Sequence, residues 1–177
     1  MWSSKALTIS TALLAMFVSG CTIEPLNASR ADSSVASGAV SNSTRTILQQ
    51  TEVEAVTDRV SQQVRNQLLF AMNGGTLLPN GKYRVKLRVE RNVKNVAIET
   101  SSRAPTASQV TIKTNYALVD KSAGKTVKQG FRQVIVPYEN TPQSFAKQRA
   151  QREAENRAAA QMAQQLRLAI AQNLADL

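Results

Sequence analysis

Alternating apolar and polar residues in the middle of the chain constrain its fold more than any other feature. Within residues 82–91, apolar side chains take every second position from Tyr83 to Val89. Successive side chains of a β-strand point to opposite faces of a sheet, so this segment predicts a strand with one buried and one open face. Strands of this kind belong to antiparallel sheets, whose apolar face must be covered by other elements.

The residues that follow predict the rest of the sheet. Two further segments suited to strands are separated by a turn of small and charged residues, which is typical of a hairpin. The expected elements are a continuation of the first strand past a bend or bulge over 93–100, a connection over 101–108, a strand over 110–118, a hairpin turn over 120–125 and a strand over 126–136. Pro137 is expected to end the last strand, because proline has no backbone N–H to donate.

Apolar residues spaced three or four apart predict one helix before the sheet and one after it. The first is expected over residues 47–72, and Asn73, Gly74 and Gly75 are expected to end it. Its apolar face consists of Val53, Val56, Val60, Val64, Leu68 and Met72. The second is predicted to start near Pro142 and to run for about thirty residues, because no later glycine or proline interrupts it. One side of it carries Phe145, Ala150, Ala154, Ala158, Met162, Leu166, Ile170 and Leu174.

The order of these elements predicts an α+β fold. Two helices would pack on one face of a small, mainly antiparallel sheet of three or four strands, forming a two-layer sandwich over residues 47–177. The other face of the sheet is expected to carry Arg84, Lys86, Arg88 and Lys113. A charged open face is ordinary for an antiparallel sheet, so a solvated surface and a ligand-binding surface both fit this pattern.

Residues 1–20 have the pattern of a secretory signal peptide. Lys5 precedes an uncharged, mostly apolar run over residues 6–18, which is shorter than the about 20 residues that a transmembrane helix needs. The run ends in Val18-Ser19-Gly20-Cys21, which resembles the lipobox of bacterial lipoproteins. The resemblance implies cleavage before Cys21 and attachment of acyl chains such as palmitate to that cysteine. Two or more such chains anchor a protein stably on a membrane.

The residues after Cys21 predict the membrane to which the protein is sorted and a flexible tether. Bacterial lipoproteins with Asp in the next position are often kept at the inner membrane, so Thr22 implies the periplasmic side of a Gram-negative outer membrane by resemblance to that sorting pattern. Residues 21–46 are rich in Ser, Ala, Asn and Thr and hold few large apolar residues. Such a segment cannot bury enough surface to order itself, so we expect a flexible tether.

The charge and composition of the chain limit its partners and its chemistry. Its 22 Lys and Arg against 12 Asp and Glu give a net charge of +10. That excess suits nucleic acid, an anionic membrane or a phosphorylated or carboxylated ligand, and it also simply keeps a protein soluble. Because the signal peptide predicts export of the protein, away from nucleic acid, we do not expect nucleic acid as its partner. With no histidine and one cysteine, the usual acid–base group and the commonest metal ligand are missing. We therefore expect no enzyme activity, no metal and no cofactor.

Several segments together resemble one family. The run 58–68, with Arg65-Asn66-Gln67-Leu68 at its end, is similar to the first helix of LptE, the lipopolysaccharide-assembly lipoprotein. Residues 140–147 resemble the start of that family's last helix, and the Ala-, Glu- and Arg-rich helix follows. The lipobox and the order of the elements also agree. One departure is visible, because family members often carry an aromatic residue and a short apolar strand soon after the lipidated cysteine, whereas a polar tether follows residues 22–26 here.

The resemblance implies a subunit of the lipopolysaccharide translocon of the outer membrane. Its partner would be the β-barrel LptD, which it would help to assemble and would plug, and its ligand would be lipopolysaccharide. No bond would be made or broken. Lipid A phosphates and acidic core sugars are anions that Arg and Lys bind by charge-assisted hydrogen bonds. By position, the family's basic contact residues match Arg103 and Lys147, and the open face adds Arg84, Lys86 and Arg88.

Two other classes of function stay open at this stage. An accessory lipoprotein of a periplasmic lipid-transport system could have the same kind of sandwich and would bind proteins that handle phospholipids. An enzyme is the third class, but without histidine a serine nucleophile would need an unusual lysine partner.

Overall fold

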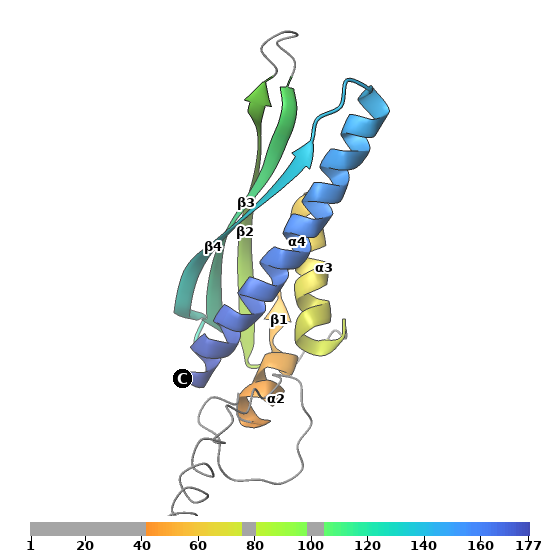
Figure 1. Ribbon diagram of the computed structural model, residues 1–177. Coiled ribbons are helices and arrows are strands. Elements are labelled where there is room, and N and C mark those ends of the chain that lie inside the picture. The colour runs from red at the N-terminus through yellow and green to blue at the C-terminus, as the bar shows by residue number, and fades with distance from the viewer. Residues whose placement is uncertain (1–41, 76–80, 99–104) are drawn as a thin grey trace, which may run out of the picture. The chain divides into compact units, whose positions relative to one another are not determined.

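Three helices and a four-stranded sheet make up residues 42–75, 81–98 and 105–177, the part of the chain that the computed structural model describes (Figure 1). In chain order the elements are α2 (Asn42–Gln50), β1 (Glu52–Val53), α3 (Arg59–Asn73), β2 (Tyr83–Ile98), β3 (Pro105–Asp120), β4 (Lys125–Glu139) and α4 (Ser144–Ala175). The expected α+β fold is confirmed. The signal peptide, Cys21 and most of the predicted tether lie outside the described residues.

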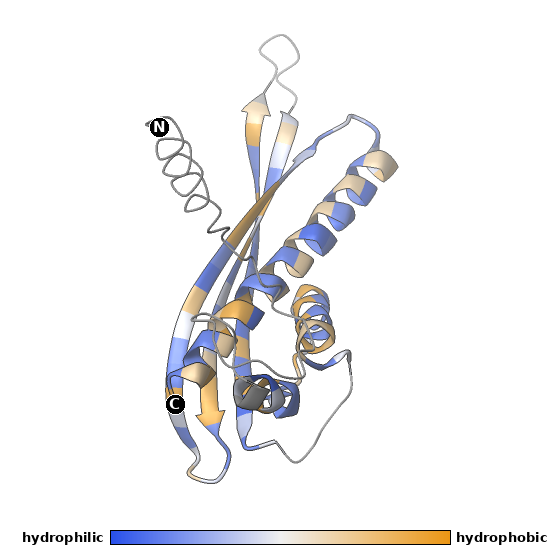
Figure 2. Cartoon of the chain, turned by 60° about the horizontal axis from the view of Figure 1, so that its bottom comes forward, coloured by the Kyte–Doolittle hydropathy of each residue, from blue (hydrophilic) through white to orange (hydrophobic). Residues whose placement is uncertain are grey.

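The sheet has the order β1-β2-β3-β4, with β2, β3 and β4 in an antiparallel meander and β1 parallel to β2. Helices α3 and α4 pack against the sheet and against each other (Figure 1). Hydrophilic and hydrophobic residues alternate along the strands, as Figure 2 shows. This alternation is the pattern that predicted one covered and one open face.

Strands β3 and β4 are longer than the sequence predicted, whereas the first strand has about the expected extent. The first one continues to Ile98 with register shifts around Ala97, which agrees with the expected extension past a bulge. β3 begins at Pro105, inside the segment predicted as a connection. Residues 120–125 form the expected hairpin turn, in which the backbone N–H of Gly124 donates to the carbonyl oxygen of Asp120 over 2.9 Å. Gly124 has φ +65°, a left-handed conformation that glycine adopts without strain.

The prediction that Pro137 ends the last strand is wrong, because β4 continues past it. Pro137 is paired in register with Gln109, and among the described strands β4 pairs only with β3. Proline is tolerated in such an edge strand because its missing N–H removes no ladder hydrogen bond. Two arginines donate to carbonyl oxygens of β4, Arg157 Nη2 to Pro137 over 3.2 Å and Arg132 Nη1 to Phe131 over 2.8 Å.

The single helix predicted over residues 47–72 is also wrong, because a short strand divides it into α2 and α3. Helix α2 ends where the Thr51 hydroxyl donates to the carbonyl oxygen of Ile47 over 2.7 Å. Val53 is buried on β1, and Asp58 begins α3 by accepting hydrogen bonds from the backbone N–H groups of its first turn. The apolar spacing across the break was therefore not one helical face. Helix α2 also takes in residues 42–46, which the sequence assigned to the tether.

The predicted end of this region and the last helix agree with the structure. Gly74 caps α3 in the left-handed conformation, with φ 71°. Helix α4 runs for 32 residues, and Ala154, Ala158, Met162, Leu166, Ile170 and Leu174 are buried along it. Phe145 is 83% exposed, so its assignment to the buried side is wrong. It lies in the first turn, ahead of Ala154, the first buried residue of α4.

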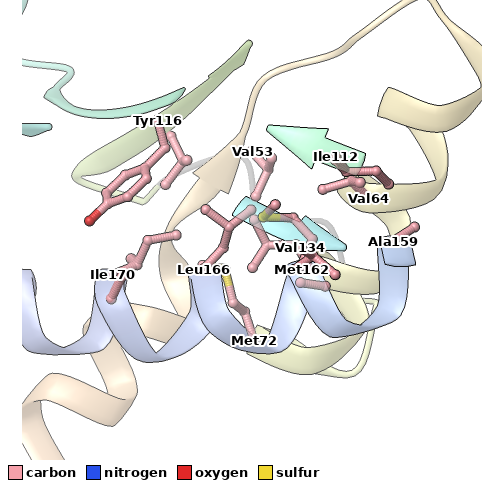
Figure 3. Close-up of a cluster of buried hydrophobic side chains, with 14 of the residues drawn as sticks. Val53, Val64, Met72, Ile112, Tyr116, Val134, Ala159, Met162, Leu166 and Ile170 are labelled. Atoms are coloured by element: carbon pink, nitrogen blue, oxygen red, sulfur yellow. The ribbon is translucent and has the colours of Figure 1, made fainter. Parts of the chain in front are cut away.

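The core lies between α4, α3 and the covered face of the sheet (Figure 3). Met162, Leu166 and Ile170 of α4 point toward the sheet side chains there. Tyr116 of β3 accepts a hydrogen bond from Asn173 Nδ2 through its hydroxyl oxygen, over 3.0 Å. Its ring lies over Gly130 of β4, where a Cβ would be only 2.7 Å from the ring atom Cζ. Glycine at this position lets the aromatic ring cross the sheet closely.

Candidate ligand-binding face of the sheet

A groove crosses the open face of the sheet between β2 and β4. Lys86 lies beside Ala117 in the register, and Arg88 lies beside Asn115. The next strand continues these two rows with Gln129 and Phe131. The groove has a volume of about 690 Å³, and it is lined by Lys86, Leu87, Arg88, Asn115, Tyr116, Ala117, Gln129, Gly130 and Phe131. It therefore has two cations on β2, the amide of Asn115 on the middle strand β3, and the amide of Gln129 and the ring of Phe131 on β4.

The two cations of the groove have donors to spare. Arg88 Nε lies 3.6 Å from Glu90 Oε1, and both side chains are well exposed, so water screens this pair. Lys86 is exposed and forms no ion pair within the described part of the chain. Ammonium and guanidinium groups placed this way can donate charge-assisted hydrogen bonds to phosphate or carboxylate oxygens.

Apolar side chains accompany these cations on the same face. Phe131 and Ile135 are each 48% exposed, although both are large and hydrophobic. They lie four residues apart on the open face of β4, with Gln133 between them, and Ile135 lies beside Thr111 in the register. Exposed apolar groups next to a basic patch suit a ligand or partner that is itself amphipathic.

Arg84, the third predicted cation of this face, serves a different contact. Its Nη2 donates to Glu52 Oε2 over 3.3 Å, and Lys121 Nζ lies 3.1 Å from the same oxygen. The hydrogen bond from Lys121 is the main cause that lowers the pKa of Glu52, and Arg84 contributes further. Because Glu52 belongs to β1, these two cations hold β1 against the sheet.

The other predicted contact residues do not join this group. Lys147 is exposed in the first turn of α4, which belongs to the helix layer and not to the open face. Arg103 lies outside the described residues. The structure thus brings Lys86 and Arg88 together, and Lys113 is exposed on the same face, beside Glu90 in the register.

The sequence did not point to Phe131, Asn115 or Gln129 as site residues, because the register that places them beside the basic residues includes a shift between Leu118 and Val119. It also missed the buried carboxylate of Glu155. A signal for this carboxylate exists, since Arg91 takes the next position of the covered face after Val89. An arginine on a covered face requires an acidic partner.

Two other kinds of site find no support in the described segments. Among residues 42–75, 81–98 and 105–177, no three His, Cys, Asp or Glu side chains come together as a metal site would require. None of the helices in these same ranges is long and apolar enough to cross a membrane.

A solved structure shares the fold of this chain. A crystal structure of a protein from Caulobacter crescentus CB15 has a TM-score of 0.62 and 24% identity over 76% of this chain and 98% of its own. A minor lipoprotein from Acinetobacter baumannii gives 0.49 and 17% over 70% and 89%, and rare lipoprotein B from Shewanella oneidensis gives 0.46 and 13% over 66% and 91%. No curated protein matches the chain.

The chain is thus a small α+β sandwich with a basic open face. The model of the LptE family, described as lipopolysaccharide-assembly, matches residues 43–170. The chain belongs to the LptE family and is a lipopolysaccharide-assembly lipoprotein, as the resemblance read from its sequence implied.

Proposed function

We propose that this protein is a subunit of the lipopolysaccharide translocon, anchored through Cys21 to the periplasmic side of the outer membrane. It assists assembly of an LptD-like β-barrel, plugs that barrel and binds lipopolysaccharide for insertion into the outer leaflet. It catalyses no reaction. Membership of the LptE family is the observation that carries this proposal.

The open face of the sheet supports lipopolysaccharide binding. Lipid A phosphates and acidic core sugars would accept hydrogen bonds from Lys86 and Arg88, whose donors are exposed. Asn115 and Gln129 would offer amide groups to sugar hydroxyls, and Phe131 would offer a flat apolar surface. The groove therefore matches the mixed polar and apolar chemistry of a phosphorylated glycolipid.

Replacing both Lys86 and Arg88 by Gln should weaken lipopolysaccharide binding about tenfold or more, because charge-assisted hydrogen bonds contribute about 1.5 to 3 kcal/mol each where they are desolvated. The measurement is equilibrium binding of the full-length protein in detergent. The matched control replaces Lys125 and Arg149, which are exposed outside the groove, and removes the same charge. If the two double variants lose the same affinity for lipopolysaccharide, the loss is an effect of net charge, and the groove is not the binding site.

The plug model predicts contacts with one barrel on most sides of the domain. A photo-crosslinking amino acid is introduced at one of four exposed positions in turn. These are Asn66 of α3, Gln164 of α4, Ser122 in the hairpin turn and Gln133 of the open face. Because a plug is surrounded by its barrel, whose interior is polar, all four should capture the same barrel protein in cells. Crosslinks from one face only, or only to soluble periplasmic proteins, would contradict the plug and favour an accessory lipoprotein of a lipid-transport system.

A further inference from the structure

A second polar cleft lies on the helix side of the sandwich, apart from the groove of the open face. It lies where the first turn of α3, the middle of β2 and the first half of α4 meet. The cleft has a volume of about 390 Å³, and it is lined by Asp58, Arg59, Val60, Arg91, Gln148, Gln151, Arg152 and Glu155. Three of its eight lining residues are arginines.

One buried carboxylate fixes two of these arginines. Glu155 is only 3% exposed, and each of its oxygens accepts from a different arginine. Arg91 Nη1 donates to Oε1 over 2.7 Å, and Arg59 Nη2 donates to Oε2. Gln151 Nε2 adds a third hydrogen bond, to Oε1 over 3.0 Å. The two guanidinium groups, from α3 and β2, are thereby held beside one point of α4.

The fixed arginines still present donors to the solvent. Their side chains are 54% exposed in Arg59 and 43% exposed in Arg91, although their carboxylate partner is buried. A guanidinium has five N–H donors, and each of these two uses one of them on Glu155. Donors held in place by a buried group lose little conformational entropy when they bind a ligand.

The cleft as a whole has an excess of positive charge. Arg152 is exposed and forms no ion pair with any residue in the described ranges. Asp58 is engaged in capping α3, since its carboxylate accepts from the backbone N–H groups of Val60 and Ser61 and from the Ser61 hydroxyl. The Ser61 hydroxyl is the main cause that lowers the pKa of Asp58. Three guanidinium groups therefore face two carboxylates, one buried and the other engaged.

We propose that this cleft binds a phosphate monoester. A phosphate monoester carries up to two negative charges and has three free oxygens. It can therefore accept hydrogen bonds from Arg59, Arg91 and Arg152 together, through the N–H groups that Glu155 does not use, whereas a carboxylate has only two oxygens and one charge. Gln148 lies within reach of a sugar attached to that phosphate. Two ligands have this chemistry, the phosphorylated headgroup of a glycolipid and a soluble sugar phosphate. The assignment to a glycolipid headgroup rests on the proposed function.

The test compares Arg152→Gln with Arg149→Gln in the full-length protein in detergent. Arg152 is chosen because Arg59 and Arg91 also hold Glu155, and Arg149 is an exposed arginine of α4 outside the cleft. Titration calorimetry with glucose 1-phosphate should show binding that glucose lacks. Arg152→Gln should weaken it about tenfold, and Arg149→Gln should leave it nearly unchanged.

A second measurement distinguishes a glycolipid headgroup from a soluble sugar phosphate. It compares the binding of lipopolysaccharide before and after enzymatic removal of its phosphates. Binding of the intact form that falls in Arg152→Gln and on dephosphorylation supports a glycolipid headgroup in the cleft. If only glucose 1-phosphate responds to Arg152→Gln, the cleft takes soluble sugar phosphates and the glycolipid assignment fails. If intact lipopolysaccharide binds the Arg152→Gln variant normally and glucose 1-phosphate binds neither protein, the cleft proposal is overturned while the proposed function stands. No binding of either ligand to the unaltered protein overturns both.

Discussion

Replacing Glu155 by alanine is expected to lower the free energy of unfolding by about 3 kcal/mol, because removing one partner of a buried ion pair leaves the other charge uncompensated. Arg59 and Arg91 are both half-exposed and can rehydrate, so the effect should lie near the lower end of the range for such pairs. Urea unfolding followed by circular dichroism measures it. Glu155→Gln keeps the shape and one acceptor, and it should cost less, about 1 to 2 kcal/mol.

Glu153→Ala is the matched control for this experiment. Glu153 lies two positions earlier in α4 and forms an exposed pair with Arg157 Nε over 2.9 Å. Exposed pairs of this kind contribute about 0.3 to 0.5 kcal/mol, so the control should differ little from the unaltered protein. Equal destabilisation by the two alanine variants would show that Glu155 does not join α3, β2 and α4 as described.

Replacing Cys21 by alanine is expected to abolish lipid attachment completely, because the chain has no other cysteine. Metabolic labelling with radioactive palmitate followed by immunoprecipitation tests this. The unaltered protein should carry the label and fractionate with outer membranes, whereas the variant should be unlabelled and keep its leader. Thr22→Ala, next to the cysteine, is a control that should retain the label. Label that persists in the Cys21→Ala protein would overturn the lipoprotein anchor.

The sheet could be predicted because strand periodicity is a local property. Alternation from Tyr83 onward placed the side chains of β2 on two faces, and the turn before Lys125 joined β3 to β4. The break between α2 and α3 could not be read from periodicity, since Val53 fits a helical spacing by chance while its backbone pairs with Val85 of β2. Asp58 marked the start of α3, but a capping residue inside a periodic run is easily read as part of a polar face.

The sequence predicts the part of the candidate site that lies on one strand, but not the parts that other elements contribute. Lys86 and Arg88 share a face because they are two residues apart, which sequence alone establishes. The residues that complete the groove, Asn115 and Phe131, depend on pairing registers between distant segments, and one of these registers shifts at Val127, an extra residue of β4. The cleft around Glu155 depends on three elements meeting, which no local pattern encodes.

The two arginines that donate to carbonyl oxygens of β4, Arg132 of β4 itself and Arg157 of α4, affect how this strand edge meets a second copy of the chain. An open strand edge is a template on which further chains can polymerise, and proteins guard against this with proline and with charged side chains. The carbonyl oxygens of Phe131 and Pro137 are already taken by Arg132 and Arg157, and Pro137 has no N–H to offer. A second copy aligning its own β4 here would find neither a continuous row of acceptors nor a neutral surface. The edge of β4 is therefore a poor template for strand addition by a second copy of the chain.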